Sequence, residues 1–513
     1  MNWKRFFSAA RRVSPLIFLL FSLSPGDGRA ATELSAKISP RLQHRLADHP
    51  AYPAIILGKT QLFTPPEGLD RFRKSNASRP RSQLRAETIG RLKEISSEQD
   101  AVLQALGNPE NAVRLWIVNA IGVTLTRAGL EKAAALDDVA YIYADRATPR
   151  FDDEGGSVAE VIRPETSDGF SIEGKASAAY LEGIRADQVW KELDVHGEGA
   201  VVGLYDSGAN YRHPDLRNRL WTNPGEMANN GKDDDGNGLV DDLYGFNFAA
   251  GSPRVLAEEK QGHGTWTGGI IAGDGAGGRI TGVAPRSRLM LLVGSGSFCH
   301  MARVVQYALE EGADVLNMSF SWPNLGQERG LIRRICDHAL AAGLVPVSGA
   351  GNFGAGGGNP APKPVQLRIP EGIPSVVAAG GVTAKGTSPP FASQGPVEWA
   401  EIRFYEDFPL PQGLTKPDVS AFPGPGYALL DHRGEGYVAP NRRIGGNSFS
   451  GAMVSGVAAL MLSAAPELPA WRVKEILEET ATPLGGSGKN NRTGAGLVNA
   501  LEAVRAARKA TAR

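Results

Sequence analysis

From residue 186 onward, short apolar runs alternate with longer segments of helical pattern, and this alternation constrains the fold more than any other feature. The apolar runs predict strands at Ala200–Tyr205, Arg288–Val293, Asp314–Phe320, Leu344–Ser348 and Ser375–Ala379. Helices are predicted at Met301–Glu311, Glu328–Ala342, Gly451–Ala464 and Trp471–Thr480. Repetition of strand, helix and strand indicates an α/β fold with a mostly parallel sheet and helices on both faces.

A smaller unit precedes this pattern. Strands are predicted there at Ala54–Leu57, Val113–Asn119 and Val139–Tyr143, and helices at Ala86–Leu106 and Arg127–Ala135, which together indicate a small α+β domain. The stretch Phe151–Ala179 is polar and rich in Gly and Ser, which is typical of a linker or a cleavable junction. The chain therefore divides into an N-terminal unit at 31–147, a linker with a processing site at 148–179, and a main domain at 180–513.

Residues 1–30 have the pattern of a signal peptide. Basic residues precede the apolar stretch Pro15–Leu23, and small residues at Gly28–Ala31 offer a cleavage site. Arg11-Arg12 allows a twin-arginine signal, but the following residues fit an ordinary secretory signal better. The apolar run Ala452–Ala465 is short and rich in Ala, Ser and Gly, so we expect a buried helix there and no stable membrane anchor.

Composition excludes some partners. Lys+Arg and Asp+Glu both total 55, so the formal net charge is zero, which argues against nucleic acid and against a polybasic membrane contact. Cys299 and Cys336 are the two cysteines. In an exported protein they could form a disulfide, and two buried free thiols are an equal alternative. We expect a monomer.

Three polar positions have the surroundings that hydrolytic chemistry needs. Asp206 follows a predicted strand directly, where sites of open parallel sheets lie, although Asp-Ser-Gly is also a common turn. His263 lies between glycines at the start of a small-residue helix, where a lone His is more often structural. Ser448 opens an apolar helix, whose free N–H groups favour negative charge, although a Ser there can also be an N-cap.

Together these segments resemble the three signatures of the subtilisin-like serine proteases, the subtilase or peptidase S8 family. They occur in the order Asp, His, Ser, which is the order of subtilisin and not of chymotrypsin or the α/β-hydrolases. The resemblance covers about residues 180–505, and further matches are Gly282–Pro285, Asn317–Ser319, Ala350–Asn352, Lys416–Ala421 and Gly496–Ala500.

The resemblance implies a serine endopeptidase that acts on proteins or peptides. In such an enzyme Ser448 attacks the peptide carbonyl, His263 moves the proton, and Asp206 orients the imidazole. The side chain of Asn352 and the N–H of Ser448 bind the oxyanion. Two alternatives are a catalytically impaired relative that only binds peptides and another serine hydrolase such as an esterase. The esterase is disfavoured by the residue order and by the absence of a Gly-x-Ser-x-Gly motif at Ser448.

The family binds substrate as an added strand, which implies backbone contacts on both sides of the peptide. The residues implied are Gly294, Ser295, Gly296, Ser319, Phe320 and Ser321, and Phe353 in the pocket for the residue before the cut. Phe353 suggests an apolar or aromatic preference. Three positions depart from the family pattern: Asn447 replaces Thr, Ala452 replaces Pro, and Ser321 replaces Gly.

The segment 233–242 is rich in carboxylates and glycine. Its oxygen-bearing positions follow the spacing of a calcium loop, without the final Glu of an EF-hand. The ligands expected from this spacing are Asp233, Asp235, Asn237, Leu239 and Asp241. A solvated acidic turn is the alternative.

The resemblance extends to the N-terminal unit, where Trp116–Ala120 and Leu136–Ile142 are similar to the end of the family's propeptide. A propeptide acts as an intramolecular chaperone and inhibitor, and its C-terminal end occupies the active site until cleavage. This implies autoprocessing within about residues 144–178. A permanent N-terminal domain is the alternative.

Overall fold

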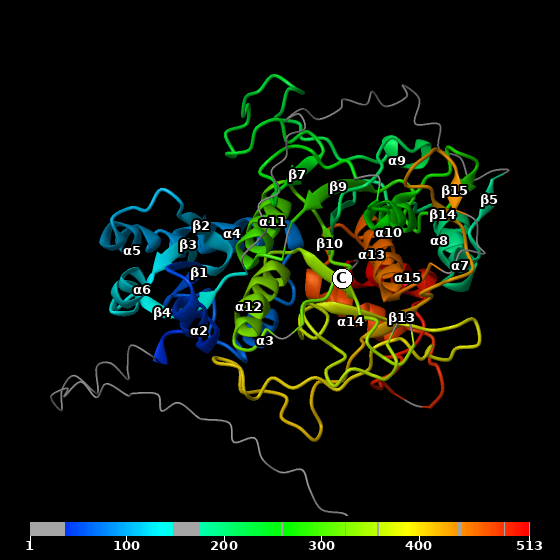
Figure 1. The fold of residues 1–513 in the computed structure, drawn as a ribbon. Helices are drawn as coiled ribbons and strands as arrows, with labels where there is room; N and C mark the ends of the chain where they lie inside the picture. The colour runs from blue at the N-terminus through cyan, green and yellow to red at the C-terminus, as the bar shows by residue number, and fades with distance from the viewer. Residues whose placement is uncertain are drawn as a thin grey trace, which may run out of the picture.

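The computed structural model describes residues 36–146 and 175–511, apart from 258–259, 295, 324, 357–358, 439–443 and 487. The expected signal peptide, most of the expected linker, and Ser295 therefore lie outside the described residues. Figure 1 shows the blue and cyan N-terminal unit beside the larger green-to-red domain, and each unit is built on one main sheet.

The larger domain is built on a seven-stranded sheet in the order β13-β12-β11-β10-β6-β9-β7, and its neighbouring strands pair in parallel. This confirms the predicted α/β class. In chain order, the strands are β6 (Val201–Asp206), β7 (Gly245–Asn247), β9 (Arg288–Val293), β10 (Val315–Asn317), β11 (Val345–Gly349), β12 (Val377–Gly381) and β13 (Val419–Ala421). The prediction missed β7 and β13, because three residues are too few to show a periodic pattern.

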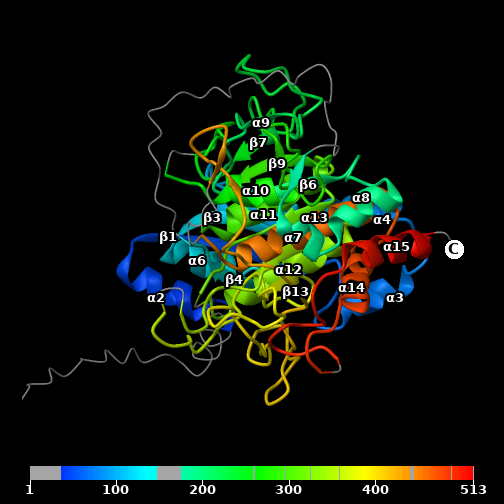
Figure 2. The same cartoon turned by 90° about the vertical axis from the view of Figure 1, so that its right-hand side faces the viewer.

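Helices cover both faces of this sheet. One face carries α8 (Ala186–Leu193), α10 (His263–Ala272), α13 (Asn447–Ala464), α14 (Ala470–Thr480) and α15 (Ala500–Thr511), and the other carries α11 (Phe298–Glu310) and α12 (Glu328–Ala341). Successive side chains of β9 point to opposite faces of the sheet. Leu289 and Leu291 therefore belong to the hydrophobic core on the first face, and Met290 and Leu292 belong to the core on the second. In Figure 2 the red helix α15 lies beside α14, and it also contacts α13.

The apolar helix α13 is the core helix of the domain. Within the described residues it is the one helix long and apolar enough to cross a membrane by length and composition, yet 83% of it is buried inside the fold. This agrees with the predicted buried helix at Ala452–Ala465. The remaining short elements are β5 (Ala176–Ser177), α7 (Ala179–Gly183), α9 (Pro214–Arg217), β8 (Arg279–Ile280), β14 (Leu429–Leu430) and β15 (Tyr437–Val438).

The N-terminal unit is an antiparallel sheet in the order β2-β3-β1-β4. Its strands are β1 (Ala51–Gly58), β2 (Val113–Leu115), β3 (Ala120–Thr126) and β4 (Val139–Ala144). Its helices are α2 (Pro40–Asp48), α3 (Gly68–Ser75), α4 (Arg81–Ser96), α5 (Gln99–Leu106) and α6 (Arg127–Ala134).

Two local predictions in this unit were wrong. The expected strand Val113–Asn119 ends at Leu115, because a 3₁₀ turn at Trp116–Val118 and a left-handed Asn119 (φ 39°) reverse the chain into β3. The expected helix Ala86–Leu106 is split into α4 and α5 between Ser96 and Gln99.

One face of the N-terminal sheet packs against the larger domain. Ile55 and Leu57 of β1 share a core with residues of α11 and α12, whereas Ala54 and Ile56 face the unit's own helices. The consequence is visible in α12, where every residue of the fourteen except Arg329 is buried. Cys336 of α12 and Cys299 of α11 are both free thiols, which decides the question that the sequence left open.

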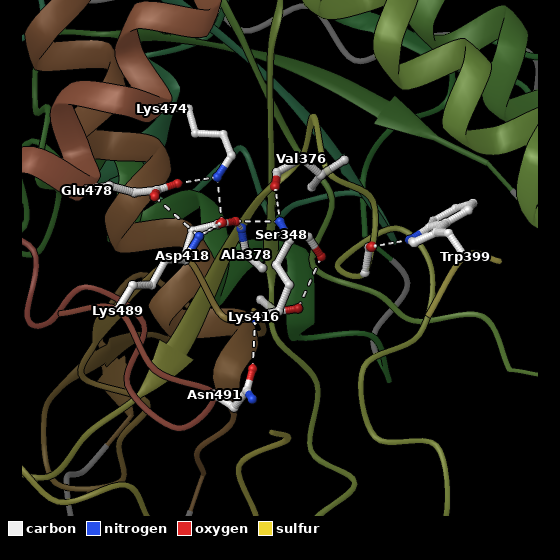
Figure 3. Close-up of polar contacts among 12 residues, drawn as sticks. Ser348, Val376, Ala378, Trp399, Lys416, Asp418, Lys474, Glu478, Lys489 and Asn491 are labelled. Carbon is white, nitrogen blue, oxygen red and sulfur yellow. Dashed lines mark hydrogen bonds and ion pairs between the residues drawn. The ribbon is translucent and has the colours of Figure 1, made fainter. Parts of the chain in front are cut away.

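A buried charge cluster ties the far edge of the parallel sheet together (Figure 3). Asp418 is 1% exposed, and its carboxylate contacts the ammonium groups of Lys416, Lys474 and Lys489 at 2.5, 2.5 and 2.7 Å. Asp418 Oδ2 also accepts the backbone N–H of Ala378 in β12. Burial alone would raise the pKa of the Asp418 carboxyl, but the three ammonium groups hold this pKa well below its ordinary value.

Asp418→Asn should therefore destabilise the protein strongly. The amide leaves the fully buried ammonium group of Lys416 without its counter-charge, whereas Lys474 and Lys489 keep Glu478, and we expect the free energy of unfolding to fall by about 3–5 kcal/mol. Urea denaturation measures this change. The control is Asp194→Asn: that carboxylate is 97% exposed and the residue is left-handed (φ 52°), a conformation Asn tolerates, so the expected change is within about 0.5 kcal/mol. Equal stability of Asp418→Asn and wild type would contradict the analysis.

Candidate functional site

Asp206 and His263 meet at the carboxyl end of the parallel sheet. Asp206 is the last residue of β6, and His263 is the first residue of α10. The His263 Nδ1 atom lies 2.8 Å from each carboxylate oxygen of Asp206. The approach depends on Gly264, because a Cβ there would lie 2.1 Å from the carbonyl oxygen of Gly208.

The Asp206 carboxylate is held in its charged form. It is 5% exposed, and it accepts hydrogen bonds from Thr267 Oγ1 (3.0 Å) and from the backbone N–H of Ser207 (2.8 Å). Burial opposes the charge, but His263 and these donors lower the pKa of Asp206. Burial likewise works against the imidazolium of His263, and the charge and hydrogen bond of Asp206 outweigh it, so the pKa of His263 is raised.

Ser448 lies in the first turn of α13, where backbone N–H groups have no intrahelical partner. Its hydroxyl donates to the carbonyl oxygen of Ser319 at 3.2 Å, and no hydrogen bond in the described part of the chain joins it to His263. Two adjoining clefts connect the residues: Ser319 and Phe320 line both the cleft that holds His263 and the pocket that holds Ser448. Hydrogen bonds between catalytic groups are often long or poorly aligned without substrate and tighten only when substrate binds.

Asn352 lies beside the start of the same helix. Its Oδ1 accepts the backbone N–H of Asn447 at 2.8 Å, and within the described part of the chain no acceptor binds its two amide hydrogens, so both can donate to another group. Asn447 in turn donates its side-chain amide to the carbonyl of Gly351 at 2.7 Å. Asn447, which stands where the family pattern has Thr, thus fixes the loop that carries Asn352.

Most of the substrate-contact residues expected from the sequence line these clefts. A cleft of about 430 Å³ is lined by residues that include Gly294, Gly296, Ser319 and Phe320, and a pocket of about 140 Å³ is lined by residues that include Ser321, Phe353 and Ser448. Sequence analysis missed Tyr205 and Trp322, whose rings flank Phe320 at centroid distances of 4.8 and 5.0 Å. An aromatic residue at the end of a predicted strand was the available signal.

The acidic loop brings together a set of carboxylates that differs from the predicted one. Ligand oxygens of Glu226, Asp235 and Asp242 lie within 4.8 Å of one another. Asp233 instead accepts backbone N–H groups at Gly236, Asn237 and Gly238, and Asp241 accepts those of Asn230 and Gly231.

Asp242 replaces Asp241 in the cluster because Asp241 has a left-handed backbone (φ 56°), which breaks the regular spacing. Asn237 donates its amide to Asp235 and Asp242, both at 3.1 Å, and Leu239 is buried with its N–H bound to Asn237 Oδ1. Glu226 was missed, because it precedes the loop and no spacing points to it.

Comparison with known proteins bears on this site. The profile of the subtilase family (peptidase S8) matches residues 197–496. Subtilisin DY of Bacillus licheniformis is 27% identical over 321 residues, which is 62% of this chain and 94% of that protein. Subtilisin E of Bacillus subtilis is 27% identical over 314 residues (60% of this chain, 66% of that protein). A probable subtilase-type serine protease of Deinococcus radiodurans is 30% identical over 325 residues (61% and 41%).

The chain belongs to the subtilase family of serine proteases. It is a serine-type endopeptidase, and its substrates are proteins or peptides.

The raised pKa of His263 predicts the acid limb of the pH profile. In the role expected from the sequence, His263 must be neutral to accept the serine proton, so kcat/KM should fall as the pH decreases through a pKa above 6.5. Asp206→Asn removes the charge that raises this pKa, so the limb should move to lower pH and kcat should drop by roughly 10⁴-fold. Peptide hydrolysis between pH 5 and about 9 measures both effects. An unshifted limb in Asp206→Asn, with Asp194→Asn as the control, would refute the assignment.

Proposed function

We propose that this protein is an exported, monomeric endopeptidase that works through an acyl-enzyme on Ser448. The Ser448 hydroxyl attacks the peptide carbonyl while His263 accepts its proton, and His263 then protonates the departing amine. Water hydrolyses the ester by the same route in reverse order. Asp206 orients the imidazole and stabilises its charged form, and the Asn352 amide and the Ser448 N–H donate to the oxyanion.

The observation that carries this proposal is the Asp206–His263 contact at the head of the cleft that adjoins Ser448. The departures at Asn447 and Ala452 raise the alternative of an inactive peptide-binding relative. Their packing favours the active enzyme, because Asn447 holds the Asn352 loop and Ala452 is buried without exposed surface. The basic and apolar pattern of residues 1–30 supports export.

The purified full-length chain and its Ser448→Ala variant provide the test. We expect wild type to react with a fluorophosphonate probe and to convert to a smaller species by intact mass, with cleavage between residues 144 and 178. Ser448→Ala should stay unlabelled and full length while keeping the circular dichroism spectrum of the folded protein. A labelled Ser448→Ala variant would remove Ser448 from the nucleophile role, and N-terminal sequencing locates the cut.

We infer that the N-terminal unit acts as a propeptide that inhibits the enzyme until cleavage. Asp145 follows β4 and caps α11: its carboxylate accepts Phe298 N–H and Ser297 Oγ–H, both at 2.7 Å. The next residue, Arg146, lies with its Nη1 3.5 Å from the Cβ position of the cleft residue Gly296. The chain therefore leaves this unit at the mouth of the substrate cleft, as expected for an inhibitory segment.

A second contact region supports the chaperone role. Arg81 pairs with Asp314 at 2.6 Å with both side chains largely buried, and it donates to the carbonyl of Pro466 at 2.8 Å. Arg85 contacts the carbonyls of Ala313 and Gly343. Ala313 and Asp314 directly precede β10, and Gly343 precedes β11, so these contacts fix the starts of two central strands. Because Arg81 and Arg85 both belong to α4, this helix can bring the two strands together during folding.

We also infer a structural calcium ion at Glu226, Asp235 and Asp242. The oxygen ligands suit this hard cation, and the buried Glu226 Oε2 has no hydrogen-bond partner among the described residues. Burial is the largest cause that raises the pKa of Glu226 and of Asp242, and the neighbouring carboxylates also raise both pKa values. A cation would relieve both effects.

Calcium should stabilise the protein and change its pH dependence. Restoring calcium after chelation should raise the free energy of unfolding by about 2–4 kcal/mol, and Asp242→Asn should abolish most of this gain.

Burial and the charges of Asp235 and Asp242 raise the pKa of Glu311 from 4.5 to about 7. The stability that this raised pKa provides is present below pH 4.5 and is lost as the pH rises through about 7, so the chelated protein should weaken between pH 5 and 8. Superimposed melting curves with and without calcium would exclude the site.

A further inference from the structure

A buried carboxyl group that the proposed mechanism does not use touches the wall of the pocket beside Ser448. Glu371 is 0% exposed. Its Oε1 accepts hydrogen bonds from Ser321 Oγ at 2.7 Å and from the backbone N–H of Arg368 at 3.1 Å. Ser321 lines the 140 Å³ pocket together with Ser448. Glu371 therefore lies behind Ser321, and a single hydrogen bond connects it to the pocket surface that a substrate side chain would contact.

The position of the Ser321 hydrogen follows from these contacts. Oε1 already accepts the amide hydrogen of Arg368, so Oε1 is an acceptor in both charge states of Glu371. Ser321 consequently gives its single hydroxyl hydrogen to Oε1, and its oxygen keeps only lone pairs for the pocket. At this point the wall offers an acceptor and no hydroxyl donor.

The second carboxyl oxygen of Glu371, Oε2, is enclosed and has no hydrogen-bond partner within the described part of the chain. An enclosed carboxyl oxygen without a donor costs free energy, and it leaves the charge of Glu371 only partly compensated. Arg368 does not supply this donor: its guanidinium carbon lies 3.4 Å from the centroid of the Phe353 ring, and its Nε donates to the carbonyl of Val365.

We propose that Glu371 is a specificity-determining residue, which acts through Ser321 to favour a substrate residue that ends in an N–H donor. The residue meant is the one before the cut bond, and glutamine and lysine are the slender side chains of this kind. The inference rests on the proposed role of Ser448, because that role places the cut bond at this pocket. It departs from the apolar or aromatic preference expected from Phe353. Arg368 covers one face of that ring.

Peptides that differ only at the residue before the cut test this proposal. The series carries Gln, Lys, Met, Phe or Glu, and Met is the matched control because it is unbranched and has no donor. We expect kcat/KM for Gln and Lys to exceed that for Met by about fivefold or more. Glu should be the poorest substrate, because its carboxylate would meet the Ser321 oxygen, which has no hydrogen to donate, in front of the carboxyl group of Glu371.

Three variants separate the contributions. Glu371→Gln keeps an acceptor for Ser321 but removes the charge, so the Gln-to-Met ratio should persist while the Lys-to-Gln ratio falls several-fold. Ser321→Gly, which restores the family residue, removes the hydroxyl and should abolish the Gln-to-Met preference. Glu401→Gln neutralises an exposed carboxylate of the same domain and should leave both ratios unchanged. If Glu371→Gln fails to fold, Ser321→Gly still decides the outcome.

The pH dependence gives a readout that a purely structural role would not move. Burial raises the pKa of Glu371 to about 7, and the charged group near it is the Arg368 guanidinium of its own turn, while the Ser321 hydroxyl faces it from the segment that follows β10. The Lys-to-Gln ratio should therefore rise as the pH increases through about 7. Titration of His263 affects both peptides equally and cancels in this ratio.

A profile in which Met or Phe matches Gln and Lys would overturn the proposal, and so would a Gln-to-Met ratio that Ser321→Gly leaves unchanged. Fluorophosphonate labelling of each variant distinguishes this failure from that of the proposed function. An unlabelled wild type would remove the role of Ser448. A labelled enzyme without a donor preference would remove only the role of Glu371.

Discussion

The close approach of the end of β11 to the start of α13 is the constraint on which the site depends. A Cβ on Gly349 would lie 2.2 Å from the carbonyl oxygen of Asn447, and a Cβ on Gly451 would lie 2.7 Å from the backbone nitrogen of Gly349. Because both positions are glycine, the helix can begin directly against the edge of the sheet. Ser448 then stands beside the loop that carries Asn352, in the first turn of the helix, where backbone N–H groups have no intrahelical partner.

Buried carboxylates have different partners in different parts of the molecule, and the kind of partner distinguishes a carboxylate that stabilises the fold from one that belongs to a binding or catalytic site. Around Asp418, three ammonium groups converge on one carboxylate at the edge of the sheet, so the charge is enclosed and matched. At Asp206 the partner is an imidazole that is 37% exposed, so a proton can enter and leave. At Glu226 and Glu371 an enclosed carboxylate oxygen has no donor among the described residues, and we propose a bound cation beside Glu226 and a substrate donor in front of Ser321, which separates Glu371 from the pocket.

The N-terminal unit and the larger domain form a continuous structure. The helix α12 has almost no exposed surface, because the sheet of its own domain covers one side and the N-terminal unit covers the other. His338 shows the depth of this contact: its ring is completely buried, its Nδ1 lies 2.6 Å from the carbonyl oxygen of Ile117, and burial lowers its pKa to about 3. Separation of the two units would expose this apolar and polar surface together.

The sequence by itself determined the α/β class, because strand and helix periodicity are local patterns, and its resemblance to the subtilases pointed to most of the residues that line the clefts. It did not determine short strands such as β7, the turn at Trp116–Val118, or the carboxylates that meet in the acidic loop. Those depend on backbone reversals such as Asp241 and on packing between segments far apart in the chain. Only the tertiary structure placed Glu371 behind Ser321, since the two residues are fifty positions apart and one hydrogen bond joins them. A local sequence pattern indicates which secondary structure a segment forms and which of its faces is buried. The hydrogen-bond partner of a buried polar atom often lies in a distant segment, so only the tertiary structure identifies it.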